Sequence, residues 1–60
     1  MSNKQGYTFY FNIFQTLGLS QKRIIAMDVE QAYEMLSLKE KQAIISVVDD
    51  DGNEYDENLN

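Results

Sequence analysis

A run of aromatic and β-branched residues near the start of the chain constrains its fold more than any other feature. Residues 7–16 are Tyr-Thr-Phe-Tyr-Phe-Asn-Ile-Phe-Gln-Thr, with neither Gly nor Pro, and this composition predicts a β-strand. Large apolar side chains stand at both odd and even positions of the run. Because successive side chains of a strand point to opposite faces of its sheet, both faces of the predicted sheet are apolar.

Further strands are predicted after this run. Residues 22–27 and 42–48 have strand-like composition, and residues 54–56 are expected to form a short fourth strand after a tight turn at Gly52. The connection over residues 17–21 is short enough for the first two strands to pair as an antiparallel hairpin.

A helix is predicted between the second and third strands. Asp28 suits its N-cap, and Gln31 stands three residues later, as in a capping box. The helix is expected to run from Val29 to about Lys39 or Lys41, and a second capping box over residues 37–40 marks a place where it would break and restart. One apolar stripe follows the helical spacing: Val29, Ala32, Tyr33 and Leu36.

This order of elements predicts an α+β protein with ββαβ topology. We expect a three- or four-stranded, mostly antiparallel sheet with one helix on one face and the aromatic strand in the middle. Strands two and three are expected to be parallel to each other and joined by a right-handed crossover. We expect residues 1–60 to form a single domain that is ordered over about residues 6–56.

The face of the sheet away from the helix is expected to be an interface. The helix is predicted to cover Tyr7, Phe9, Phe11 and Ile13, which leaves other large side chains of the strands without cover. Burial of apolar surface contributes roughly 25 cal/mol per Å², so leaving these side chains in contact with water would lose several kcal/mol of stabilising free energy. That loss is comparable with the whole free energy of unfolding of so small a chain. The simplest cover is a second copy in a two-fold dimer. The predicted dimer interface is Tyr10, Phe14, Ile44 and Val48.

Two other covers for this face remain open. One is a different partner protein. The other is the terminal segment of the chain itself, which carries Tyr55 and Leu59 and would fold back over the sheet.

Acidic residues gather at one end of the sequence. The net charge is −5, yet residues 1–48 carry +1 and residues 49–60 hold six acids and no base. A near-neutral body with an acidic end does not suit direct nucleic-acid binding, which needs Lys and Arg against phosphates. The acidic end is expected either to contact a basic surface of a partner protein or to solubilise the chain. The predicted contact residues are Asp49, Asp50, Asp51, Glu54, Asp56 and Glu57.

Chemistry-bearing side chains are scarce. The chain has no His and no Cys, which excludes the usual zinc sites and the Ser-His and Cys-His nucleophile pairs. Residues 49–53 are similar to part of a calcium loop, but with Gly52 at position six the two anchor positions fall on Val47 and Asn58. We therefore predict a non-enzyme with no catalytic, cofactor or metal site.

A cytoplasmic location is expected. No apolar run approaches the roughly 18 residues of a membrane span, so no membrane partner is predicted. Residues 1–6 are polar and lack the apolar region of a secretory signal.

Residues 23–33, Arg-Ile-Ile-Ala-Met-Asp-Val-Glu-Gln-Ala-Tyr, resemble the strand-to-helix junction of many small ββαβ proteins of phages and mobile elements. In size, acidity and lack of catalytic side chains the chain also resembles phage-encoded inhibitors of bacterial defence systems. That resemblance implies a stoichiometric inhibitor that binds a host defence or nucleic-acid-processing protein in the host cytoplasm, as a homodimer. The bases in the predicted helix and first two strands depart from strong DNA mimics, which leaves protein binding as the implied mode.

Two alternative functions stay open. The first is a structural or regulatory protein-interaction module of a phage or plasmid. The second is a small DNA-associated regulator, because residues 18–21 resemble the opening of a helix-turn-helix and residues 36–41 resemble sigma-factor recognition segments.

Overall fold

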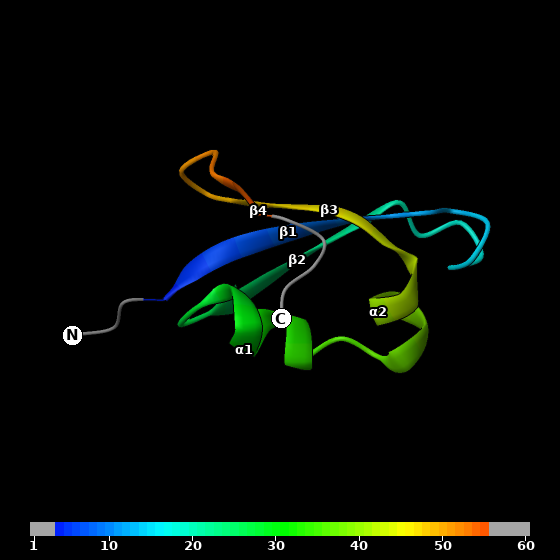
Figure 1. Cartoon of the computed structure of the whole chain (residues 1–60), viewed down its shortest axis with the longest axis horizontal. Helices are drawn as coiled ribbons and strands as arrows, with labels where there is room; N and C mark the ends of the chain where they lie inside the picture. Colours follow the sequence, from blue (N-terminus) through cyan, green and yellow to red (C-terminus); the bar gives the residue numbers. More distant parts are fainter. Residues whose placement is uncertain (1–3, 56–60) are drawn as a thin grey trace.

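The computed structural model of the chain describes residues 4–55, which form a four-stranded sheet with two short helices on one side (Figure 1). The strands lie in the order β2-β1-β3-β4, and every neighbouring pair is antiparallel. The α+β class and the central position of β1 are therefore confirmed. The elements are β1 (Gln5–Phe11), β2 (Gln21–Ala26), α1 (Val29–Glu34), α2 (Leu38–Ala43), β3 (Ile44–Asp49) and β4 (Glu54–Tyr55).

The first strand ends sooner than predicted. Its last residue is Phe11, because Asn12 starts a turn: the Asn12 side-chain oxygen accepts a hydrogen bond from Phe14 N at 3.0 Å, and its carbonyl oxygen accepts one from Gln15 N at 3.0 Å. The expected strand over residues 12–16 is wrong. Ile13, which we placed under the helix, instead lies in this turn and is exposed.

The helical segment breaks at the second capping box. Asp28 caps α1 by accepting a hydrogen bond from Gln31 N at 2.7 Å. Ser37 caps α2, where Glu40 N donates to Ser37 Oγ at 3.2 Å and Ser37 N donates to Glu40 Oε1 at 2.8 Å. Both N-cap residues are as predicted, because capping depends on residues three apart in the sequence. The predicted capping box is complete at Ser37 but not at Asp28, where Gln31 Oε1 accepts from Met27 N at 2.7 Å. The single helix becomes two helices of one to two turns each.

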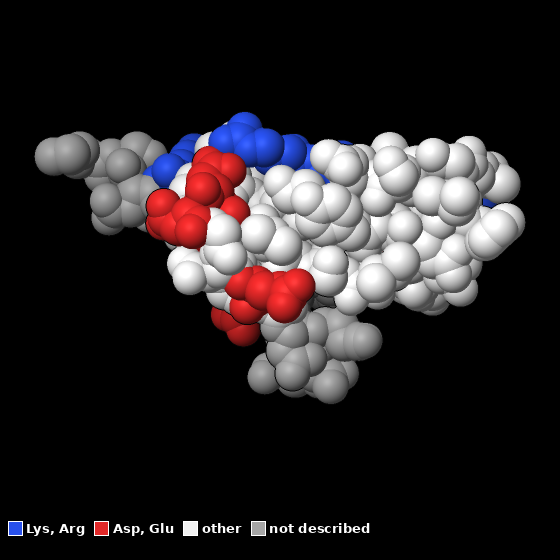
Figure 2. Space-filling model, turned by 90° about the horizontal axis from the view of Figure 1, so that it is seen from above, with Lys and Arg blue, Asp and Glu red and all other residues white. Residues whose placement is uncertain are grey.

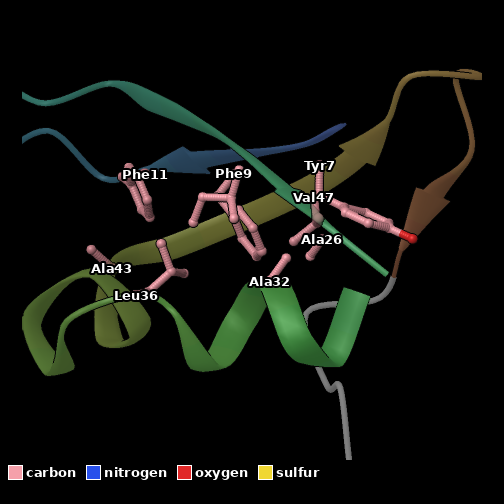
Figure 3. Close-up of a cluster of buried hydrophobic side chains, with 9 residues drawn as sticks. Tyr7, Phe9, Phe11, Ala26, Ala32, Leu36, Ala43 and Val47 are labelled. Atoms are coloured by element: carbon pink, nitrogen blue, oxygen red, sulfur yellow. The ribbon is translucent and has the colours of Figure 1, made fainter. Parts of the chain in front are cut away.

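The core lies between the helices and one face of the sheet (Figure 3). Phe9 and Val47 are opposite each other in the β1–β3 register, and both are fully buried. The prediction that Tyr7, Phe9 and Phe11 share the helix side is confirmed. The buried cluster is Tyr7, Phe9, Phe11, Ile24, Ala26, Ala32, Leu36, Ala43 and Val47.

A bulge changes the face on which one predicted interface residue lies. Tyr10 pairs with Ser46 but Phe11 pairs with Ile44, so Ile45 is an extra residue on β3. Ile44 thus moves to the helix side, where it packs against the core. The prediction that Ile44 shares the open face with Val48 is therefore wrong, since a strict two-residue period does not hold across the bulge.

Candidate protein interface

The connection between β1 and β2, residues 12–20, carries large apolar side chains into solvent. We call it the hairpin tip; it is the cyan loop at the right of Figure 1. Phe14 is 88% exposed and Leu17 is 89% exposed, and Ile13 and Leu19 are exposed beside them. The tip contains no charged residue. Single exposed apolar residues are ordinary on proteins, but four within nine residues form a patch of the kind that marks an interaction site.

Hydrogen bonds within the chain close the hairpin tip. Gly18 N donates to the carbonyl of Ile13 at 2.9 Å, and the Thr16 hydroxyl donates to the carbonyl of Leu19. At the base, Asn12 N donates to the carbonyl of Ala43 at 2.8 Å, which ties the tip to the junction of α2 and β3. The apolar side chains are thus held on a defined turn, which lowers the entropy that a partner would have to remove on binding.

The backbone of the hairpin tip is strained at Leu17. This residue has φ 59°, in the left-handed region, and Gly18 follows with φ 103°. The left-handed conformation costs an L-residue with a Cβ roughly 1–2 kcal/mol, and Gly avoids that cost. Leu17 makes no compensating burial, because its side chain is almost fully exposed. Backbone strain of this kind is concentrated at functional sites, so it supports a role for the Leu17 side chain outside the isolated fold.

At the acidic end of the chain, Asp49 is a structural residue. It is only 5% exposed, and its carboxylate accepts hydrogen bonds from Asp51 N, Asn53 N, Asn53 Nδ2 and the Tyr55 hydroxyl at 2.9, 2.9, 3.2 and 2.9 Å. Burial disfavours its charge, but the hydrogen bonds from Asn53, Tyr55 and Asp51 outweigh burial and hold its pKa below the ordinary value. Donation to this carboxylate raises the pKa of Tyr55 to about 12. The contact role of Asp49 stays a prediction, and its burial leaves this carboxylate little surface to offer a partner.

Asp50 is also engaged within the chain. Arg23 Nη2 and Nε donate to its two carboxylate oxygens at 2.7 and 3.2 Å, and Gly6 N donates to Oδ2 at 2.9 Å. The hydrogen bonds from Arg23 and Gly6 lower the pKa of Asp50, and the same pairing raises the pKa of Arg23. Asp51 and Glu54 are exposed, while Asp56 and Glu57 lie outside the described residues.

Figure 2 shows the sheet face opposite the helices. Most of the red and blue side chains gather at one end of this face, and its other half is almost entirely white (Figure 2). Of the four residues predicted for the dimer interface, Tyr10 and Val48 lie on this open face, Phe14 lies in the hairpin tip and Ile44 lies on the core side. Ile25 of β2 and Ile45 of β3 are also exposed, at 47% and 59%, so exposed apolar side chains lie on the strands as well as at the tip.

Leu17 and Leu19 were missed as candidate residues. Gly18 marked their segment as a connection, and connections are ordinarily polar. The available signal was composition, because residues 13–19 hold four large apolar side chains and no charge.

No protein-family model matches the chain, and no curated protein or solved structure is found to be similar to it. Within residues 4–55, no helix is long and apolar enough to cross a membrane. A functional assignment therefore rests on the residues of this chain.

Proposed function

We propose that this chain is a non-enzymatic protein-binding protein and that the hairpin tip is its contact surface. One observation carries the proposal: Phe14 and Leu17 are 88% and 89% exposed on an uncharged turn that is closed by its own hydrogen bonds. Burying a Phe or Leu side chain fully contributes about 1.5–3 kcal/mol each. In a partner pocket that buries both side chains, Phe14 and Leu17 would contribute most of the binding free energy, as hot-spot residues do.

The proposed target is a host defence or nucleic-acid-processing protein, which the chain inhibits stoichiometrically in the bacterial cytoplasm. The resemblance in size and acidity to phage-encoded inhibitors supports this choice. Asp51 and Glu54 are exposed acids that would favour the basic surface of an enzyme acting on nucleic acids. Such charges raise the rate of encounter, whereas the apolar tip supplies the affinity.

Affinity purification from the bacterial host tests this proposal with a matched pair of variants. Leu17→Asp places a charge in the hairpin tip, and Leu38→Asp places the same charge at the first residue of α2, where Leu38 is 71% exposed. Asp tolerates the left-handed backbone at position 17, so both variants are expected to fold. The wild-type chain and Leu38→Asp should recover the same host protein, and Leu17→Asp should recover about tenfold less, which corresponds to a loss of roughly 1.4 kcal/mol.

Expression of the same three chains in the host supplies the functional measurement. The wild-type chain and Leu38→Asp should weaken the targeted host activity, and Leu17→Asp should not. Equal recovery by Leu17→Asp would refute the hairpin tip as the contact surface. Recovery of a phage- or plasmid-encoded protein would indicate that the chain is an interaction module of the phage or plasmid and not an inhibitor of a host protein. Steeply salt-dependent DNA binding would indicate a DNA-associated regulator.

A further inference from the structure

The outer edge of β2 carries unpaired backbone groups in the part of the chain that the structure describes. β2 ends the sheet order, with β1 on its inner side. Phe11 N of β1 donates to the carbonyl of Ser20 at 2.9 Å. Phe11 and Ser20 are therefore a hydrogen-bonded pair of the β1–β2 ladder, in which both residues direct their backbone groups toward each other. In an antiparallel ladder such pairs alternate, which turns the N–H and C=O groups of Gln21, Arg23 and Ile25 outward.

Apart from the two charged residues Lys22 and Arg23, this edge lacks the features that usually prevent strands from pairing. β2 has six residues, no Pro and an uninterrupted register from Gln5↔Ala26 to Tyr10↔Gln21. The opposite edge, by contrast, is blunted: β4 has two residues, and β3 carries the bulge at Ile45. The unprotected edge of the sheet is thus β2.

The two charges on β2 are already neutralised. Lys22 Nζ lies 3.2 Å from a Glu40 carboxylate oxygen, and Arg23 Nη2 lies 2.7 Å from an Asp50 oxygen. A second β2 strand can therefore approach without strong like-charge repulsion. An acidic segment of another protein finds no free positive charge on this strand to attract it.

We propose that β2 pairs antiparallel with β2 of a second copy, about a two-fold axis through Ile24. In this register the outward-bonding residues Arg23 and Ile25 of one copy exchange hydrogen bonds with Ile25 and Arg23 of the other. The aliphatic stem of each Arg23 covers the opposing Ile25, which is 47% exposed in the single chain. A register centred on Arg23 would instead place two arginines directly opposite each other, which is unfavourable.

Two-fold pairing also closes the assembly. Each copy uses its one long free edge, and the resulting sheet of eight strands ends at both sides in the two-residue β4. Exposed acids of the β3–β4 region, Asp51 and Glu54, belong to these outer edges. The self-pairing goes beyond the proposed function and does not rest on it, although a dimer would present two hairpin tips to a target.

Sedimentation of purified chains tests the pairing without any host partner. The wild-type chain should sediment as a dimer at micromolar concentration. Ile25→Pro removes an outward N–H and no β1–β2 bond, so it should halve the sedimenting mass, whereas Ile25→Thr keeps the N–H and should remain dimeric. Tyr10→Asp alters the open face only and should also remain dimeric.

Two results would overturn the proposal: a monomeric wild-type chain or a dimeric Ile25→Pro. If Ile25→Pro is dimeric and Tyr10→Asp is monomeric, the contact lies on the open face instead. If Ile25→Pro fails to fold, backbone amide hydrogen exchange of the wild-type chain tests whether the β2 edge is paired. The amides of Arg23 and Ile25 should be protected at high concentration and lose that protection on dilution, while the amide of Ile24 stays protected. Unprotected Arg23 and Ile25 amides at every concentration would exclude the edge dimer.

Discussion

The guanidinium group of Arg23 lies against Gly6, so close that a Cβ at position 6 would stand 2.3 Å from Arg23 Nε. Gly6 N donates to Asp50 Oδ2 at 2.9 Å, and Arg23 Nη2 donates to the same oxygen at 2.7 Å. Because Gly6 has no side chain, Arg23 of β2 can reach across β1 to Asp50, the residue after β3. A glycine is needed here for close approach and not for a positive φ angle.

Gly6→Ala should displace Arg23 and break its pairing with Asp50. Because the pair is about half exposed, we expect the thermal midpoint Tm to fall by no more than about 5 °C. Arg23→Ala should lower Tm by a similar amount in the wild-type chain and by almost nothing in the Gly6→Ala chain. A double-mutant cycle by thermal unfolding measures this coupling, and fully additive losses would show that Gly6 and Arg23 act separately.

Asp49 and Asp51 should differ sharply in their contribution to stability, although they are two residues apart in an acidic run. Asn at position 49 would direct an NH₂ group at N–H and O–H donors that now point to a carboxylate. We expect Asp49→Asn to lower Tm by on the order of 10 °C and the exposed Asp51→Asn to leave it unchanged. Differential scanning calorimetry checks both. Equal midpoints for the two variants would mean that the hydrogen bonds to Asp49 do not stabilise the turn.

Acid should destabilise the protein through three carboxylates. Hydrogen bonding lowers the pKa of Asp49 and Asp50 below 3.8 and that of Glu40 below 4.5, the first cause for Glu40 being the bond from Ser37 N. A lowered folded-state pKa gives stability that is present above the unfolded-state pKa and is lost as pH falls through the folded value. Tm should therefore be level near neutral pH and fall below about pH 4. Asp49→Asn should reduce the slope of that fall, and an unchanged slope would count against the assignment.

Leu17→Gly should stabilise the fold and weaken its function. Gly adopts the left-handed backbone at position 17 without the cost that Leu incurs, but Gly also gives the unfolded chain more conformational entropy. The net effect should be a rise of about 0.5–1 kcal/mol in the free energy of unfolding. Leu19→Gly is the matched control, because Leu19 does not have a positive φ and should lose stability instead. Denaturant unfolding measures both changes, and recovery of the host partner measures the loss of contact. A Leu17→Gly chain that is both less stable and fully active would contradict the assigned strain and the assigned role.

Local signals predicted the fold best. The caps at Asp28 and Ser37 depend on residues three apart, and the shared face of Tyr7 and Phe9 follows from the two-residue period of one strand. The end of β1 was not predicted, because the aromatic and β-branched composition of residues 7–16 favours a strand throughout and Asn12 is the single turn-forming residue within it. The side chain of Asn12 ends the strand by capping the turn.

Non-local contacts account for the remaining errors. The extra residue at Ile45 depends on how β3 pairs with β1, and it moves Ile44 to the opposite face of the sheet. Asp49 has the composition of a solvated acid, and its burial follows only once Asn53 and Tyr55 fold back onto it. No pattern of period two or 3.6 encodes either contact.

Site-specific photocrosslinking in host cells tests the role of the hairpin tip most directly. A photoreactive phenylalanine analogue at Phe14 should leave the fold unchanged, since that ring is 88% exposed, and the same analogue at Leu38 serves as the control. We predict one dominant covalent adduct to a host protein from position 14 and none from position 38. No adduct from position 14, or the same adduct in equal yield from both positions, would contradict a protein contact made by the hairpin tip.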